Sequence, residues 1–177
     1  MTFAQRAKKI RWLVLDVDGV LTDGKIVYDD RGRELKFFDV QDGAGLVYWK
    51  RAGRHFAIIT ARNSPVVAKR GRELIADRIY QGHIRGKLEA YNDLKRRFRV
   101  SDAAICAVGD DLMDLPMLRR VGLAIAVENA VPEVKRAAHY VTRQAGGHGA
   151  VREVIERLLK AQGLWRQILA RNVPMSK

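Results

Sequence analysis

The sequence predicts an α/β fold, a doubly wound parallel sheet (Rossmann-like) without a cap domain, and three observations support this prediction. Short apolar runs alternate with longer segments of helical periodicity. The runs are apolar at consecutive positions, as in strands that helices cover on both faces. The chain has 177 residues, 47% of them hydrophobic, which suffices to bury the core of one domain. Strand–helix alternation of this kind is typical of parallel sheets with helices on each face.

The predicted strands are short and bounded by loop signals. In chain order they are Trp12–Val17, Phe56–Thr60, the weaker Arg78–Gln81, Ile105–Gly109 and Leu123–Val127. The other segments have the apolar spacing of helices. These predicted helices are Gly43–Ala52, Ser64–Leu74, Lys87–Phe98, Leu112–Arg120 and Ala150–Ala161. In the last of them, Val151, Ile155 and Leu158 recur at the spacing of one buried face.

One segment interrupts the alternation directly after the first strand. Lys25–Tyr28 and Glu34–Phe38 are rich in strand-forming residues, and a polar turn with a glycine joins them. This pattern predicts a β-hairpin inserted over about residues 25–38. It stands where the first helix of the alternation would be expected.

The spacing of the predicted elements leaves no room for a further domain. About 40 residues separate Asp18 from Thr60, and about 25 separate Thr60 from Lys87. The hairpin, two helices and one short strand fill these intervals, so a cap of domain size does not fit. We therefore expect a single domain over residues 1–177, with a loose tail over about 163–177, where Pro174 argues against regular structure.

Composition narrows the partners and the compartment. The formal net charge is +13, but no nucleic-acid motif or aromatic interleaving accompanies the basic residues. We therefore expect the charge to serve an anionic substrate, with no nucleic acid as partner. No apolar run has the length of a membrane span, and no secretion signal follows the N-terminal residues. With Cys106 as the single cysteine, the protein is expected in the cytoplasm, without a membrane partner.

Two carboxylates stand at the end of the first predicted strand. Asp16 and Asp18 are separated by one residue, so their side chains project on the same side of the strand. The carboxyl end of an open parallel sheet is where ligands bind. Two neighbouring carboxylates repel each other unless a cation or a proton offsets their charge. A loop of Asp and Gly that merely turns the chain is the simpler alternative.

A second acidic group follows the strand Ile105–Gly109. Asp110 and Asp111 stand where the strand ends, and Asp114 lies one turn into the next predicted helix. Carboxylate oxygens without a neighbouring histidine or cysteine favour Mg²⁺ over zinc. Helix capping would account for one of these three acids.

Two further polar residues stand between the acidic groups. Thr60 ends the second strand, and Lys87 begins the helix that follows the weak strand. Each has an ordinary alternative, a cap for Thr60 and a solvated lysine for Lys87. Their order along the chain, between the two acidic groups, favours a shared site.

This order of motifs resembles the haloacid dehalogenase superfamily, from about residue 10 to residue 160. The resemblance implies that Asp16 is the nucleophile and Asp18 the general acid/base. It implies that Thr60 and Lys87 bind the phosphoryl group. The Mg²⁺ ligands it implies are Asp16, Asp18 and Asp110, with Asp111 and Asp114 in support. An aspartate at position 18 is typical of the phosphatase or mutase branch of the superfamily.

Finer features resemble the family of 3-deoxy-D-manno-octulosonate 8-phosphate phosphatases. They are the sequence from Asp16 to Gly24 followed by a hairpin, Asp42-Gly43, and the late Ala145–Glu153 segment. The resemblance implies a homotetramer whose neighbouring subunits supply the missing cap, in the synthesis of a lipopolysaccharide precursor. Two departures concern the substrate: His148 stands where that family has Arg, and Gly86 precedes Lys87 in place of an acidic or amide residue. The candidate substrate-binding residues are Arg62, Gly19 and His148.

Three alternatives to this function remain open at the level of sequence. One is a phosphatase for a related acid sugar, such as a nonulosonate 9-phosphate. A second is a phospho-acceptor signalling module, which also carries an aspartate, a threonine and a lysine on a doubly wound sheet. Asp18 argues against that module, because a protein that keeps its phosphate needs no acid/base beside the nucleophile. The third is a basic nucleic-acid-binding protein.

Overall fold

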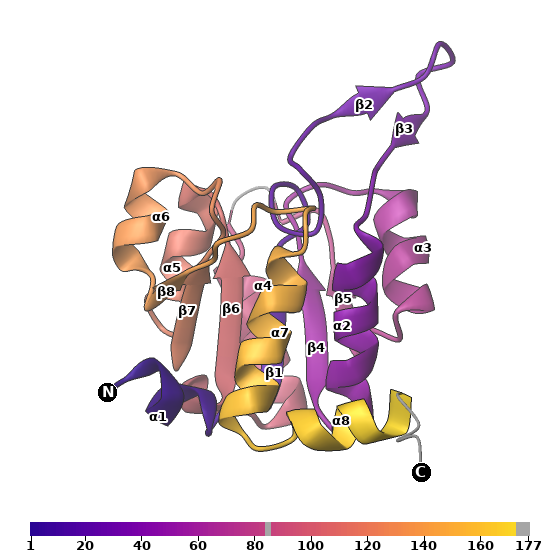
Figure 1. Cartoon of the computed structure of the whole chain (residues 1–177). Coiled ribbons are helices and arrows are strands. Elements are labelled where there is room, and N and C mark those ends of the chain that lie inside the picture. Colours follow the sequence, from indigo (N-terminus) through magenta and orange to yellow (C-terminus); the bar gives the residue numbers. More distant parts are fainter. Residues whose placement is uncertain (84–85, 173–177) are drawn as a thin grey trace.

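The computed structural model describes residues 1–83 and 86–172, and a six-stranded parallel sheet forms its centre (Figure 1). The strands are β1 Trp12–Leu15, β4 His55–Ile59, β5 Arg78–Tyr80, β6 Ile105–Gly109, β7 Leu123–Ala126 and β8 Tyr140–Val141. Their order is β5-β4-β1-β6-β7-β8. The chain thus winds from β1 to one edge, returns to β6, and continues to the other edge. The predicted doubly wound sheet is confirmed, and its topological switch point lies between β1 and β6.

Two layers of helices cover the sheet (Figure 1). The helices are α1 Phe3–Ala7, α2 Val40–Arg51, α3 Pro65–Glu73, α4 Leu88–Phe98, α5 Leu115–Leu118, α6 Pro132–Ala137, α7 Ala150–Ala161 and α8 Trp165–Asn172, with short 3-10 turns η1 Asp102–Ala104 and η2 Leu112–Asp114. α2 packs against α7 on one face, and α4 packs against α5 on the other. None of the helices within the described residues is long and apolar enough to cross a membrane.

Helix starts follow capping residues in the sequence. α2 begins at Val40, three residues before the predicted start, because the Asp39 side chain accepts from the backbone N–H groups of Gln41 and Asp42. α3 begins after Ser64, whose hydroxyl accepts from the backbone N–H of Val67. These caps fix the ends of helices that the apolar spacing places only approximately.

The predicted hairpin is present and projects beyond the carboxyl edge of the sheet (Figure 1). Its strands, β2 Val27–Tyr28 and β3 Glu34–Leu35, are shorter than expected. Asp29 closes the turn by accepting from the backbone N–H groups of Arg31 and Arg33. No cap domain occurs within the described residues, in agreement with the prediction.

The predicted loose tail is wrong over Trp165–Asn172, which form α8. Ile168 is buried, and Trp165 packs on the core edge with Tyr48 at a ring distance of 6.2 Å. These long-range contacts stabilise a helix that its own weak pattern does not predict. The remaining tail residues, 173–177, lie outside the described part of the chain. α1, α6 and β8 were likewise not predicted, because each has six residues or fewer.

Candidate active site

The site lies at the carboxyl ends of the two central strands. Asp16 follows β1 and Asp110 follows β6, and these strands pair directly, with Leu15 beside Val108. Both strands are buried throughout, so their register is fixed by packing on both faces. The pairing brings two acids that are far apart in the sequence to the switch point of the sheet.

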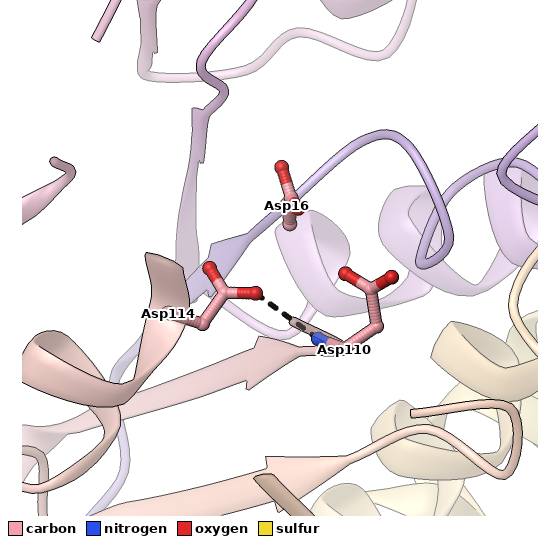
Figure 2. Close-up of side chains that lie close together, drawn as sticks. All are labelled: Asp16, Asp110 and Asp114. Carbon is pink, nitrogen blue, oxygen red and sulfur yellow. Dashed lines mark hydrogen bonds between the residues drawn. The ribbon is translucent and has the colours of Figure 1, made fainter. Parts of the chain in front are cut away.

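Three carboxylates gather at this point (Figure 2). Oxygens of Asp16, Asp110 and Asp114 lie within 4.8 Å of one another. Asp114 is fully buried, and its Oδ2 accepts from the backbone N–H of Asp110 at 3.0 Å. Asp111 is exposed and caps the turn η2, with its Oδ1 accepting from the N–H of Leu112 at 2.7 Å. Within the acidic motif, Asp110 and Asp114 therefore belong to the cluster, whereas Asp111 caps the turn η2.

Lys87 binds two of these carboxylates. Its Nζ lies 2.7 Å from Asp16 Oδ2 and 2.8 Å from Asp114 Oδ1, and its side chain is buried. Burial acts to lower the pKa of Lys87, but the two carboxylates outweigh it and raise that pKa. Lys87 is therefore a cation held against Asp16, and its predicted binding of phosphoryl oxygens stays a prediction.

The electrostatics of the cluster suit a divalent cation. Burial, together with the neighbouring Asp16 and Asp114 carboxylates, raises the pKa of Asp110 to about 8. Burial also raises the pKa of Asp16 to about 6, with Lys87 opposing it. Asp110 Oδ1 is buried without a hydrogen-bond partner. Hard oxygen donors with excess negative charge and a free oxygen fit Mg²⁺.

The predicted role of Asp18 in metal binding stays a prediction. The Asp18 carboxylate is not in the acidic cluster, and the buried Asp114 takes the third place instead. Asp18 pairs with Lys36 of the hairpin segment, and Arg62 Nε lies 3.9 Å from its Oδ2. The i, i+2 spacing places Asp16 and Asp18 on one side of a regular strand, but β1 ends at Leu15. The two side chains therefore lie in different surroundings.

A cavity of about 250 Å³ opens over these residues. It is lined by Asp16, Asp18, Gly24, Thr60, Ala61, Arg62, Lys87, Asp110, Asp111, Met113 and Asp114. Thr60 is buried at the end of β4, beside β1. Arg62 donates to Glu34 Oε1 at 2.9 Å and to the Tyr28 hydroxyl at 3.1 Å. The predicted motif residues thus share one cavity, and the hairpin adjoins it.

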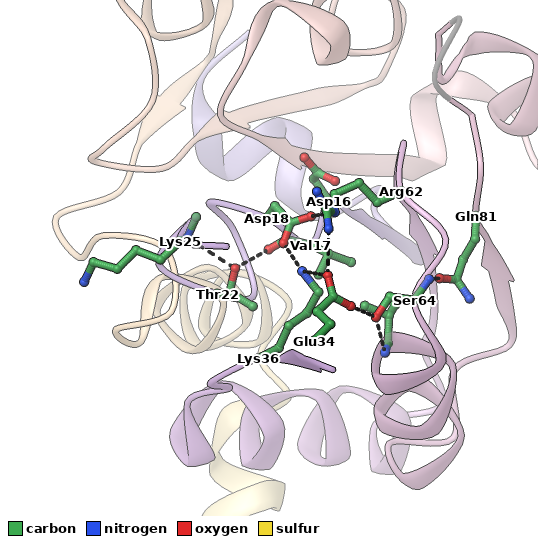
Figure 3. A network of polar contacts seen from close by, with 12 residues as sticks. Asp16, Val17, Asp18, Thr22, Lys25, Glu34, Lys36, Arg62, Ser64 and Gln81 are labelled. Atoms are coloured by element: carbon green, nitrogen blue, oxygen red, sulfur yellow. Dashed lines mark hydrogen bonds and ion pairs between the residues drawn. The ribbon is translucent and has the colours of Figure 1, made fainter. Parts of the chain in front are cut away.

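Two charged residues of the hairpin segment were not predicted as part of the site (Figure 3). Glu34 contacts Arg62 and the Ser64 hydroxyl, and Lys36 contacts Asp18 and Glu34. The spacing of these two residues could have predicted their shared position. Side chains alternate along an extended segment, so residues 34 and 36 face one side and Leu35 and Phe37 face the other.

The late glycine-rich segment supports the loop after Asp16. Gly146 leaves no room for a side chain, because an added Cβ would lie 1.7 Å from the Gly19 carbonyl oxygen. Asn129 joins both segments, donating to Gly19 O at 3.0 Å and accepting from Gly146 N–H at 2.6 Å. At Gly19, with φ +88°, an added Cβ would lie 2.0 Å from Asp110 Oδ2. Gly19 therefore shapes the wall of the site.

His148 is not brought to this cavity in the single chain. It is exposed and lines a separate hollow beside α7, with Arg152 and Lys160 among its neighbours there. A role for His148 at the substrate stays a prediction.

Comparison with known proteins agrees with this geometry. A family profile described as haloacid dehalogenase-like hydrolase matches residues 78–155. The chain is 46% identical over 158 residues to the 3-deoxy-D-manno-octulosonate 8-phosphate phosphatase of Escherichia coli K12, a match that spans 89% of this chain and 84% of that protein.

Solved structures give the same result. One is the 3-deoxy-D-manno-octulosonate 8-phosphate phosphatase of Moraxella catarrhalis in complex with magnesium ion, phosphate ion and KDO molecule. It is similar with a TM-score of 0.93 and 41% identity, over 96% of this chain and 97% of that chain. The cobalt-bound deoxy-D-mannose-octulosonate 8-phosphate phosphatase of Haemophilus influenzae has a TM-score of 0.86 and 36% identity, over 90% of this chain and 92% of that chain.

Proposed function

Because the chain belongs to the haloacid dehalogenase-like hydrolases, and within them to the family of 3-deoxy-D-manno-octulosonate 8-phosphate phosphatases, we propose that it hydrolyses 3-deoxy-D-manno-octulosonate 8-phosphate. The observation that carries this proposal is the cluster of Asp16, Asp110 and Asp114, in which the Lys87 ammonium contacts Asp16 and Asp114. This arrangement presents a carboxylate nucleophile beside a cation and a metal site, as phosphoryl transfer requires. The reaction would contribute to the synthesis of a lipopolysaccharide precursor.

Asp16 is the nucleophile in this proposal. One of its carboxylate oxygens attacks phosphorus in line with the departing sugar oxygen, and an aspartyl-phosphate forms as the P–O bond to the sugar breaks. Lys87, which contacts Asp16 Oδ2 at 2.7 Å, neutralises charge on the transferring group. The Thr60 hydroxyl, at the end of the neighbouring strand β4, binds another phosphoryl oxygen.

Mg²⁺ is the proposed cofactor, with Asp16, Asp110 and Asp114 as the candidate carboxylate ligands. When bound, the ion offsets negative charge on the phosphoryl oxygens during transfer. Asp110 keeps a buried oxygen without a hydrogen-bond partner for this purpose. Asp18 contributes no carboxylate to the cluster, so its proposed role is in proton transfer.

Asp18 serves as the general acid and then as the general base. It protonates the leaving alkoxide of the sugar, and then takes a proton from the water that attacks the aspartyl-phosphate. Its carboxylate lines the cavity and contacts Lys36 of the hairpin segment. Arg62, which lines the same cavity and has a side chain that is 40% exposed, is the candidate for contact with the substrate carboxylate.

The substrate is tested by phosphate release from a panel. The panel contains 3-deoxy-D-manno-octulosonate 8-phosphate, a nonulosonate 9-phosphate, a neutral hexose phosphate and nucleoside monophosphates, each with and without Mg²⁺. We expect the highest kcat/KM for the eight-carbon acid sugar, because Arg62 lines the cavity and can pair with the sugar's carboxylate. The net charge of +13 on the whole chain also favours a multiply anionic ligand. Preference for a nucleotide or a neutral sugar would overturn the substrate proposal.

We also propose that four copies of the chain assemble and cover the site. The apolar hairpin side chains Ile26, Tyr28, Leu35 and Phe37 are 43%, 56%, 45% and 72% exposed. A two-stranded hairpin is marginally stable alone, and its open edges favour pairing. Phe38 packs on its own chain, with the Arg70 guanidinium 5.7 Å from its ring, and is therefore not part of this exposed surface.

Two further proposals concern nucleic-acid binding and the location of the protein in the cell. We propose that no nucleic acid is bound, because many arginines pair with local carboxylates, such as Arg33 with Asp29 and Arg136 with Glu133. A filter-binding assay at low salt checks this, since phosphate contacts give a steep salt dependence. We propose a cytoplasmic location, which cell fractionation would test, because the one cysteine, Cys106, is a buried thiol.

A further inference from the structure

Lys36 occupies an unusual position for a lysine of a surface hairpin. It directly follows β3, a strand of two residues, and its neighbours Leu35 and Phe37 are 45% and 72% exposed. The Lys36 side chain is only 1% exposed. A buried ammonium is costly unless opposite charges and hydrogen bonds compensate for the lost water. The charged partners of Lys36 therefore explain why its ammonium is buried.

Four charged side chains form a closed ring beside the cavity, with Asp18 and Arg62 in the cavity lining and Glu34 and Lys36 outside it (Figure 3). Lys36 Nζ pairs with Asp18 Oδ1 and lies 3.3 Å from Glu34 Oε1. Glu34 Oε1 also accepts from Arg62 at 2.9 Å, and Arg62 Nε returns to within 3.9 Å of Asp18 Oδ2. Two cations and two anions thus alternate, and their charges cancel. The ring joins the hairpin segment to the loop after β1 and the loop after β4.

We propose that Lys36 is a positioning residue, which fixes the Asp18 carboxylate in the wall of the cavity so that Asp18 meets the leaving oxygen of the substrate. The inference rests on the proposed role of Asp18 in the phosphatase reaction. Asp18 follows the end of β1, where strand pairing does not hold its backbone, so its placement depends on side-chain contacts. Glu34 in turn holds Lys36 and Arg62.

Direct binding of substrate by Lys36 is the competing role. The 1% exposure of the side chain opposes it, because a ligand would need the ammonium at the cavity surface. Lys36 is also not among the residues that line the cavity, whereas Asp18 and Arg62 are. The geometry therefore places Lys36 behind Asp18 rather than beside the ligand.

The test is a double-mutant cycle between positions 36 and 18. Lys36→Met, Asp18→Asn and the double variant are assayed in the full-length protein with Mg²⁺, on the acid-sugar phosphate and on 4-nitrophenyl phosphate. Lys36→Met is expected to lower kcat about 10- to 100-fold for the acid-sugar phosphate with KM unchanged, the scale of a misplaced catalytic group. In the Asp18→Asn background the same change is expected to cost less than about twofold, because contacting residues couple.

Control variants separate positioning from folding. Lys25→Met removes a hairpin lysine that is 77% exposed, and it should leave kcat unchanged. Lys36→Arg keeps the cation and should recover part of the lost kcat. If Lys36→Met fails to fold or assemble, the cycle is run with Lys36→Arg, whose smaller loss should also vanish in the Asp18→Asn background.

Three results would overturn the positioning role. They are equal losses in the two backgrounds, a rise in KM confined to the acid sugar, and wild-type kcat for Lys36→Met. A wild-type protein that hydrolyses 4-nitrophenyl phosphate but not the acid sugar would refute the proposed substrate alone. The cycle would then decide the role of Lys36 on 4-nitrophenyl phosphate.

Discussion

Asp16 and Asp18 are neighbours in the sequence but have different surroundings in the structure. Burial, with a smaller contribution from Asp114, raises the pKa of Asp16 to about 6, although Lys87 opposes this shift. Asp18 lines the cavity and is part of the charged ring with Lys36. Enzymes that use two carboxylates commonly divide nucleophilic and proton-transfer roles between different surroundings. The same division is expected here.

Substitution of the two aspartates should separate these roles. Asp16→Asn is expected to abolish turnover, because no covalent intermediate forms without the carboxylate. Asp18→Asn should lower kcat about 10²- to 10⁴-fold, the contribution of a general acid/base. Steady-state kinetics measures both, with thermal unfolding as the control for folding. Substantial phosphatase activity in Asp16→Asn would contradict the mechanism.

Metal removal should abolish activity, and added Mg²⁺ should restore it. Asp110→Asn is expected to raise the Mg²⁺ concentration for half-maximal activity by about tenfold or more, because it removes a charged oxygen donor from the cluster. Titration calorimetry with Mg²⁺ measures the same change without turnover. The matched control is Asp30→Asn in the exposed hairpin turn, which should leave Mg²⁺ binding unchanged. Full activity in excess chelator would refute the metal requirement.

At the scale of elements, α2 caps α7 through a buried side chain. The N-cap of α7 is Gly149, which has no side chain to bind the free N–H groups. Asp42 of α2 supplies the acceptor instead, with its Oδ1 at 2.7 Å from the backbone N of Arg152. Burial raises the pKa of Asp42 to about 6, although backbone hydrogen bonds oppose the shift. This contact fixes the helix that follows the glycine-rich segment.

Asp42 should make stability depend on pH. Its folded pKa of about 6 lies above the ordinary value of 3.8, so the folded state keeps a proton that the unfolded chain releases. As the pH rises from about 4 to about 6, the free energy of unfolding of the wild-type protein therefore falls by ~3 kcal/mol. Asp42→Asn keeps an oxygen acceptor but carries no titrating charge. The free energy of unfolding of this variant, relative to wild type, should therefore rise as the pH increases from about 4 to about 6.

Urea unfolding of both proteins at pH 4 and pH 7 measures the difference. Asp42→Ala, which loses the acceptor, should be less stable than Asp42→Asn at both values, by about 1 kcal/mol or more. An unchanged difference between wild type and Asp42→Asn from pH 4 to pH 7 would show that Asp42 does not titrate in this way.

At the scale of the whole molecule, the hairpin is the element that adjoins the site. The hairpin rises beyond the sheet at the same edge as the acidic cluster (Figure 1). A site open to bulk water loses electrostatic stabilisation of the transition state. We propose that other copies of the chain supply a cover for the site. Closed symmetric assembly through the hairpins would bury their apolar side chains.

Assembly and activity should therefore fall together when the hairpin surface is charged. Phe37→Asp is expected to dissociate the tetramer and to lower activity, because Phe37 is the most exposed of the hairpin's apolar side chains. Leu169→Asp in α8, at the opposite edge of the sheet, is the matched control, with 45% exposure in the wild type. Sedimentation velocity at micromolar concentration measures the assembly. A stable, fully active wild-type monomer would refute the proposal.

The sequence by itself determined five of the six strands of the sheet and the helices between them, the hairpin, and the positions of the chemical motifs. These features follow from local patterns, because apolar periodicity reports burial and a polar residue after a buried strand reports the sheet edge. Asp16, Thr60, Lys87 and Asp110 were found in this way, and the structure places all four around one cavity.

Only the tertiary structure decided which side chains meet. It placed Asp114 rather than Asp18 in the acidic cluster, paired Lys36 with Asp18, and brought Asp42 to the start of α7. It also formed α8 from a tail with no clear pattern. Each of these contacts joins residues of different elements that become neighbours only when the chain folds. The burial that stabilises the contacts also exists only in the folded chain. Local periodicity does not predict which residues become partners, so these contacts are known only from the folded structure.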